Sequence, residues 1–139
     1  MTKIAPVFLI VDKEEQPENV INNFSAYFHK KNQSIHCLQV HTAAECLKMM
    51  MTHKNIGVVV VDENLPDLSG LTLVTLLKRM KPEVEIIFTT ACHDPQKEID
   101  ARLVGILYYG VKPVDWPLLG QIVERTLTKQ NKTLLLSNH

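Results

Sequence analysis

The 139-residue sequence lacks several features that mark large classes of protein. It has no net charge, because 15 Lys and Arg residues balance 15 Asp and Glu residues, so no global field attracts DNA, RNA or anionic lipid. It contains no run close to the ~18 apolar residues of a membrane span, and its first residues do not resemble a leader. Its length fits one domain rather than a multidomain enzyme. We therefore expect one globular domain that binds neither nucleic acid directly nor a membrane.

Cysteine and glycine are both scarce. The three cysteines, Cys37, Cys46 and Cys92, form no CxxC pair and lie in apolar stretches without the spacing of metal ligands. This usage is typical of a reducing compartment, so we expect a cytoplasmic protein. No Gly-rich or Ser/Thr-rich phosphate loop follows Val11, where the first apolar run ends, which argues against flavin binding.

Short apolar runs predict the strands of a sheet. Four of them are unbroken and rich in β-branched residues, which is the pattern of a parallel sheet buried on both faces. These runs span residues 7–11, 56–61, 84–88 and 106–109. A weaker run at residues 34–40 alternates apolar and polar side chains, which indicates an edge strand.

Helical patterns separate these strands. They span residues 17–28, 43–52, 69–80, 94–104 and 115–127. Thr42 and Glu45 form a capping box for the second helix. Five strand–helix units in succession predict an α/β fold with a doubly wound, five-stranded parallel sheet and helices on both faces. We assign residues 4–128 to one domain, and residues 129–139 to a C-terminal helical extension or the start of a linker.

Polar side chains follow four of the predicted strands. Asp12, Asp62 and Thr90 come at strand ends, and Lys112 lies three residues after the last run. Taken singly, each could be a helix cap, a turn former or a surface charge. Because the carboxyl ends of parallel strands meet at one edge of a sheet, the four together predict a functional site there.

Three blocks of the sequence resemble the receiver domain of bacterial two-component response regulators, the family with the fold of the chemotaxis regulator. The blocks are residues 58–70, with Asp62 after four valines, 86–91, with Thr90 before an alanine, and 105–113, which end in Lys112 and a proline. The similarity covers about residues 6–127. It implies a flavodoxin-like three-layer sandwich with strand order 2-1-3-4-5.

The resemblance assigns a role to each polar residue. It makes Asp62 the phosphorylated carboxylate, and it places magnesium on Asp12, Asp62 and the backbone carbonyl of Asn64. Lys112 and Thr90 would contact the phosphoryl oxygens. Such groups are needed because a carboxylate that attacks a phosphoryl group repels its oxygens unless cations neutralise them.

The resemblance also implies a switch and a set of partners. Phosphorylation would draw Thr90 inward and let the Tyr109 ring follow it. The expected output surface combines the helix at 94–104, the strand at 106–109 and the helix at 115–127. A histidine kinase or a phosphotransfer protein would supply the phosphoryl group. An effector domain, a downstream protein or a second copy of the chain would bind the output surface.

One position departs from the family pattern. Receivers usually carry two acids after the first strand, and the second one binds magnesium, whereas here Lys13 follows Asp12. An ammonium group cannot bind a metal ion, and it could instead neutralise Asp62. Two hypotheses stay open: the site binds magnesium more weakly, or it is a pseudo-receiver that signals through protein binding alone.

We therefore expect a phospho-accepting receiver that is no enzyme beyond self-catalysed phosphorylation and dephosphorylation of Asp62. The first alternative is the phosphorylation-independent pseudo-receiver. The second is a haloacid-dehalogenase-like phosphatase, which also carries an aspartate after a hydrophobic strand. Those enzymes require Asp-x-Asp and a cap domain, but here the third residue is Asn64 and the chain is short.

Overall fold

The structure is a computed structural model that describes residues 6–14 and 35–137. Its strands are β1 (Val7–Val11), β2 (His36–Val40), β3 (Ile56–Asp62), β4 (Glu85–Thr90) and β5 (Tyr108–Val111). Its helices are α2 (Ala43–Thr52), α3 (Gly70–Met80), α4 (Pro95–Val104) and α5 (Trp116–Ser137). The helix expected at residues 17–28 lies outside the described residues.

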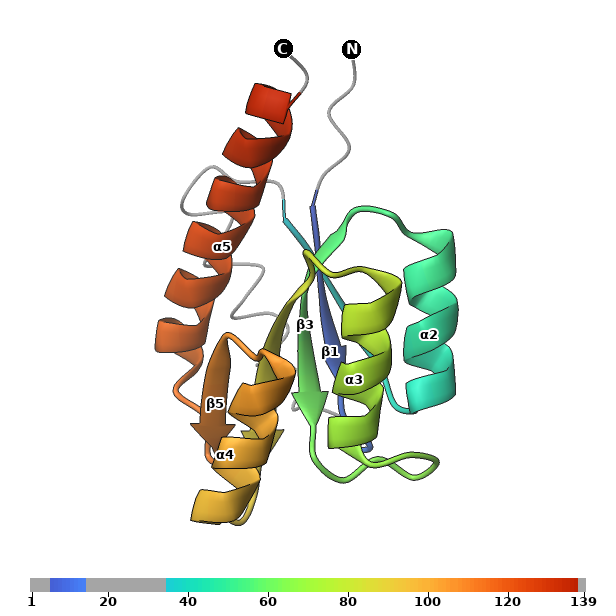
Figure 1. Ribbon diagram of the computed structural model, residues 1–139, viewed down its shortest axis with the longest axis vertical. Coiled ribbons are helices and arrows are strands. Elements are labelled where there is room, and N and C mark those ends of the chain that lie inside the picture. The colour runs from blue at the N-terminus through green and yellow to red at the C-terminus, as the bar shows by residue number, and fades with distance from the viewer. Residues whose placement is uncertain (1–5, 15–34, 138–139) are drawn as a thin grey trace.

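The strands form one five-stranded sheet in the order β2-β1-β3-β4-β5. Every strand pair is parallel. The predicted α/β fold class and strand order are therefore confirmed, and β2 lies at one edge, as its alternating pattern indicated. Parallel pairing explains why all the strand ends that carry polar residues meet at one edge of the sheet (Figure 1).

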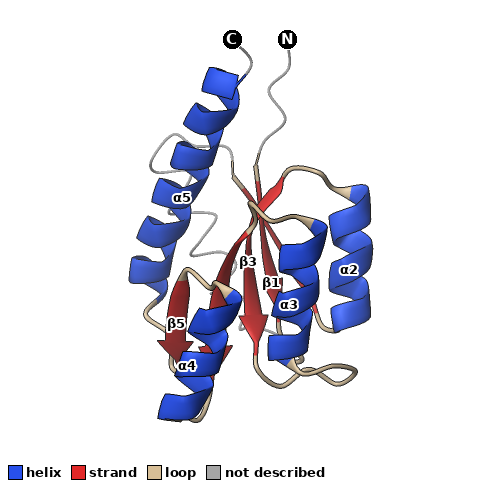
Figure 2. Cartoon of the chain, in the orientation of Figure 1, coloured by secondary structure: helices blue, strands red, loops and turns tan. Residues whose placement is uncertain are grey.

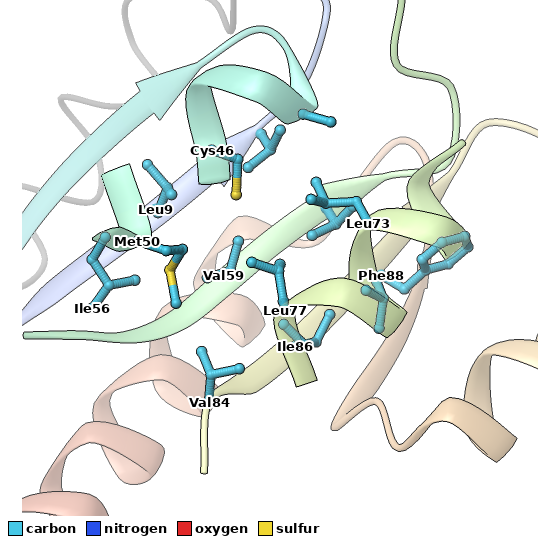
Figure 3. Close-up of a cluster of buried hydrophobic side chains, with 14 of the residues drawn as sticks. Leu9, Cys46, Met50, Ile56, Val59, Leu73, Leu77, Val84, Ile86 and Phe88 are labelled. Carbon is cyan, nitrogen blue, oxygen red and sulfur yellow. The ribbon is translucent and has the colours of Figure 1, made fainter. Parts of the chain in front are cut away.

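Two hydrophobic clusters cover the two faces of the sheet, because successive side chains of a strand point to opposite faces. Val7, Leu9 and Val11 of β1 pack in the cluster that contains the buried residues of α2, α3 and α4. Phe8 and Ile10 pack in the opposite cluster with α5. Figure 2 shows the resulting layers, and Figure 3 shows the first cluster, where α2 and α3 contact the sheet.

The helix ends follow local signals in the sequence. The side chains of Thr42, Ser69 and Asp94 accept backbone N–H bonds at the starts of α2, α3 and α4. Gly105 ends α4 with φ 98°, a left-handed conformation that favours glycine. α5 continues without a break across residue 128, and its last turns extend beyond the sheet (Figure 1). No helix in the described part of the chain is long and apolar enough to cross a membrane.

Candidate functional site

Buried polar residues gather at the carboxyl edge of the sheet. Among the residues that the structure describes, the buried polar or charged ones are Asp12, Asp62, Thr89 and Thr90, each at most 4% exposed. All four lie at or just after the ends of β1, β3 and β4. Burying a polar side chain costs free energy unless it is hydrogen-bonded, so their shared position marks a site.

An ammonium group bridges the two buried carboxylates. The Lys112 Nζ atom lies 2.7 Å from Asp12 Oδ2 and 2.8 Å from Asp62 Oδ1. We call these three residues the acidic pocket. Partial burial alone would lower the pKa of Lys112, but the hydrogen bonds and charges of Asp12 and Asp62 outweigh it and raise the pKa above its ordinary value. The lysine is therefore firmly charged, as neutralising two adjacent carboxylates requires.

The backbone positions both carboxylates in the same way. Asp12 Oδ1 accepts the Glu14 N–H, and Asp62 Oδ2 accepts the Asn64 N–H, each at 3.0 Å. Each aspartate thus closes a tight turn directly after its strand, which fixes the side chain. Beside Asp62, Gly70 begins α3 so close that a Cβ atom there would collide with the Asp62 carbonyl oxygen. A glycine is therefore required where α3 packs against the end of β3.

Lys112 reaches this pocket from the edge strand. Its backbone N–H donates to the Thr90 carbonyl at 2.8 Å, which continues the ladder between β4 and β5 by one residue. The bond between Lys112 and Pro113 is cis. The chain thus brings an ammonium from residue 112 to a carboxylate 100 residues earlier in the sequence.

Two neighbouring threonines at the end of β4 point to different carboxylates. The Thr89 hydroxyl donates to Asp62 Oδ1 at 3.3 Å. The Thr90 hydroxyl, which we expected beside Asp62, instead donates to Glu63 Oε2 at 2.6 Å. The reason is the two-residue period of a strand, which directs adjacent side chains to opposite sides. Thr89 is a contact of Asp62 that the sequence analysis missed, although this period could have indicated it.

Glu63 forms a second cluster at the rim of the site. Its Oε2 atom lies 2.6 Å from Lys97 Nζ on α4, in addition to its bond from Thr90. Lys97 also donates to the Cys92 carbonyl at 2.9 Å. We call Glu63, Thr90 and Lys97 the rim cluster. It links the end of β3, the end of β4 and α4, and no pattern in the sequence predicted it.

The expected switch aromatic lies inside the fold. Tyr109 of β5 is 8% exposed, and its ring stacks on Phe88 with centroids 5.9 Å apart. Its hydroxyl lies 3.3 Å from Nδ1 of His93 in the loop before α4. In this structure, therefore, the Tyr109 side chain is packed beneath the loop that joins β4 to α4.

Lys13 is not one of the cations of the acidic pocket. It is exposed, and within residues 6–14 and 35–137 it forms no ion pair with either aspartate. The cation on Asp62 is Lys112 instead. The hypothesis that Lys13 neutralises Asp62 therefore has no support in this arrangement.

The acidic pocket offers the oxygen atoms that magnesium prefers. Asp12 and Asp62 provide two buried carboxylates, and the backbone of Asn64 follows directly. Over the described part of the chain, no group of three or more His, Cys, Asp or Glu side chains could hold a metal ion. Mg²⁺ usually binds through one or two carboxylates and keeps several water ligands, so this donor set fits Mg²⁺ without a third acid.

Comparison with known proteins identifies relatives. The family model for the response regulator receiver domain matches residues 8–124. The chain is 31% identical over 90 residues to the transcriptional regulatory protein DpiA of Escherichia coli K12, which covers 65% of the chain and 39% of DpiA. It is 30% identical over 95 residues to the transcriptional regulatory protein CitT of Bacillus subtilis, covering 68% of the chain and 41% of CitT. The chain thus spans about two fifths of these relatives.

A solved structure has the same fold. The crystal structure of the signal receiver domain of a putative LuxO repressor protein from Vibrio parahaemolyticus superposes with a TM-score of 0.79 at 18% identity. The superposition covers 98% of this chain and 100% of that one. At this identity the likeness concerns the fold alone.

Proposed function

This chain belongs to the response regulator receiver family, and on that premise we propose that Asp62 accepts a phosphoryl group from a histidine kinase or a phosphotransfer protein. The observation that carries the proposal is the Lys112 ammonium, which lies 2.8 Å from Asp62 and 2.7 Å from Asp12. A carboxylate can attack phosphorus in line, but its charge repels the phosphoryl oxygens. Lys112 is placed to neutralise that charge as it develops.

The other residues at the site have separate roles in this proposal. Asp62 is the nucleophile, and Thr89 and the Asn64 N–H hold its carboxylate in place. Asp12 holds the Lys112 ammonium beside Asp62 through its own ion pair with the lysine. Magnesium, held by Asp12, Asp62 and the Asn64 carbonyl, would supply further positive charge for the phosphoryl oxygens. The chain acts as a switch rather than a turnover enzyme, with at most self-catalysed phosphorylation and dephosphorylation of Asp62.

The proposed output surface carries most of the exposed large apolar side chains in the described part of the chain. Five of the seven exposed large hydrophobic residues in the described part of the chain lie between residues 99 and 118. They are Ile99, Leu103, Leu107, Val111 and Leu118. These residues belong to α4, the loop before β5, β5 and α5, which follow one another along the chain (Figure 1). Such a group indicates binding of an effector domain, a downstream protein or a second copy of the chain.

The cell compartment is part of the same proposal. Cys37, Cys46 and Cys92 are all free thiols. Unpaired cysteines are typical of a reducing environment, so we place the protein in the cytoplasm.

A second candidate function is favoured by Lys13. Where receivers usually carry an acid, this exposed lysine removes one potential magnesium ligand. In that case the domain would bind its partners without phosphorylation. The two functions differ in one measurable property, namely covalent modification of Asp62 in the presence of magnesium.

Intact mass spectrometry after acetyl phosphate treatment tests the proposal. We expect the gain of one phosphoryl group with magnesium, and no gain after Asp62→Asn. Asp67→Asn is the matched control, because Asp67 is an aspartate of the same loop whose carboxylate accepts the Ala43 and Ala44 N–H groups at the start of α2. Retained labelling in the Asp62 variant would move the site elsewhere. A wild-type chain that stays unlabelled at high magnesium would favour the phosphorylation-independent module.

A further inference from the structure

We infer that Glu63 is a positioning residue that holds the Thr90 hydroxyl away from Asp62 in the unmodified protein. The inference rests on the proposed function, because Thr90 is expected to contact the phosphoryl group on Asp62. The observation that carries it is the 2.6 Å hydrogen bond from Thr90 Oγ1 to Glu63 Oε2. Thr90 cannot serve the phosphoryl group until that bond is broken.

Three further contacts fix Glu63 in this position. Lys97 Nζ lies 2.6 Å from the same Oε2 atom, so the carboxylate is held from α4 as well as from β4. The Glu63 backbone is held too, since its N–H donates to the Thr89 carbonyl at 2.9 Å and its carbonyl accepts the Gly70 N–H at 2.8 Å. The carboxylate therefore has a rigid base and two partners. A hydrogen bond to such a carboxylate is stronger than one between neutral groups.

The single donor hydrogen of the Thr90 hydroxyl is already engaged in this state. It accepts the Cys92 N–H at 3.2 Å and donates within reach of both Glu63 Oε2 and the Cys92 carbonyl. A hydroxyl has one donor hydrogen, so a bond to a phosphoryl oxygen must replace the bond to Glu63. Phosphorylation thus exchanges one anionic acceptor for another.

The exchange would reach α4 through Lys97. Once Thr90 leaves, Glu63 keeps Lys97 as its remaining side-chain partner, and the spacing between β4 and α4 is no longer fixed by a shared carboxylate. The exposed Ile99 and Leu103 lie two and six residues after Lys97 on the same helix. Glu63 therefore connects the phosphorylation site to the output surface by a route separate from Tyr109.

The first test measures the unmodified protein. Urea unfolding of wild type, Glu63→Ala, Thr90→Val and the double variant gives the coupling between the two side chains. We expect Thr90→Val to lower the folding equilibrium constant. The factor by which it does so should be about tenfold smaller in the Glu63→Ala background than in wild type. Additive effects of the two variants would overturn the inference. Because this test involves no phosphorylation, its outcome does not depend on the proposed function.

The second test measures the rate of labelling by acetyl phosphate. Glu63→Asp keeps the charge but shortens the side chain by one methylene, so its carboxylate no longer reaches Thr90. We expect Glu63→Asp and Glu63→Ala both to label severalfold faster than wild type, and to have no such effect in a Thr90→Val background. Glu98→Gln is the matched control, because Glu98 pairs with Arg102 on α4 and does not contact Thr90.

Equal acceleration by Glu63→Ala with and without Thr90 would mean that Glu63 acts through charge alone, and the inference would fail. The inference would also fail if Glu63→Ala were labelled faster than wild type and Glu63→Asp were not. If wild type is not labelled at Asp62 at all, the proposed function fails, and the unfolding cycle still decides whether Glu63 holds Thr90.

Discussion

The acidic pocket and the rim cluster contain residues that are adjacent in sequence, but their surroundings differ. Each joins a lysine to a carboxylate at a distance of 2.6–2.8 Å. In the acidic pocket the aspartate side chains are only 4% and 6% exposed, whereas Glu63 of the rim cluster is 22% exposed; the two lysines are alike, at 27% for Lys112 and 26% for Lys97. Equal distances therefore do not mean equal energies, because water screens the Glu63 carboxylate more than the buried aspartates.

The two clusters also separate two tasks. Asp62 and Thr89 point into the pocket, while the next residue of each pair, Glu63 and Thr90, faces the rim. Parallel strands in register make this possible, because Asp62 pairs with Thr89 across the ladder. The pocket is suited to holding charge for chemistry. The rim, which includes α4, is suited to passing the result to the surface.

Replacing each lysine in turn gives the largest expected difference between the clusters. Lys112→Met leaves two buried carboxylates without their cation and should lower the free energy of unfolding by about 3 kcal/mol. Lys97→Met breaks a pair whose carboxylate is more exposed and should cost much less. Urea unfolding at neutral pH measures both. Similar losses for the two variants would show that burial does not separate the clusters.

A double variant checks the cause of that loss. Adding Asp62→Asn to Lys112→Met removes one of the two uncompensated charges, so we expect part of the lost stability to return. If the double variant is less stable than Lys112→Met, the lysine acts through packing of its stem rather than through its charge.

Gly70→Ala should disturb both clusters at once. A Cβ atom at this position meets the Asp62 carbonyl oxygen and the Glu63 Cα atom, which are both backbone atoms and cannot move independently. We expect the free energy of unfolding to fall by about 2 kcal/mol. Gly105→Ala is the control, because it adds strain at a left-handed residue where a Cβ atom would meet only the Lys78 side chain, at an ordinary contact distance of 3.6 Å. A harmless Gly70→Ala would contradict the close packing of α3 on β3.

The acidic pocket could be predicted from the sequence, and the rim cluster could not. Asp12, Asp62 and Lys112 each follow a strand, so their meeting follows from the parallel sheet alone. The contact of Glu63 with Thr90 and Lys97 depends on side-chain direction and on where α4 packs. No sequence pattern encodes those two features.

The same limit applies to the threonines. A family pattern marks Thr90 by its neighbour Ala91, but it does not say which carboxylate the hydroxyl faces before phosphorylation. The two-residue period of β4 predicts that Thr89 and Thr90 differ in direction. Only the structure relates those directions to Asp62 and Glu63.

Lys13 provides a test of the pocket that leaves the rim unchanged. Lys13→Asp adds a carboxylate beside Asp12 and should tighten magnesium binding by about tenfold. Lys13→Ala separates the two causes, because it removes the positive charge without adding a ligand. Calorimetric titration with magnesium chloride measures both variants. Unchanged affinity in Lys13→Asp would mean that a side chain at residue 13 does not reach the metal site.

The smallest effect, on thiol reactivity, gives a reporter of the rim alone. Burial raises the pKa of Cys37 and Cys46 to about 12, so almost no thiolate forms on either at neutral pH. Cys92 is exposed, and its backbone N–H and carbonyl both contact the Thr90 hydroxyl. A disulfide reagent should therefore modify one thiol rapidly, and Cys92→Ser should abolish that fast phase.

The rate of this fast phase should respond to the rim cluster and not to the pocket. Glu63→Ala frees Thr90 and Lys97, which hold the Cys92 backbone, and should change the rate by roughly twofold. Asp12→Asn changes only the pocket and should leave the rate as it is. A change of the same size in both variants would mean that the two clusters move together. A change in the acidic pocket would then alter the rim cluster directly, and the two clusters could not be assigned separate tasks.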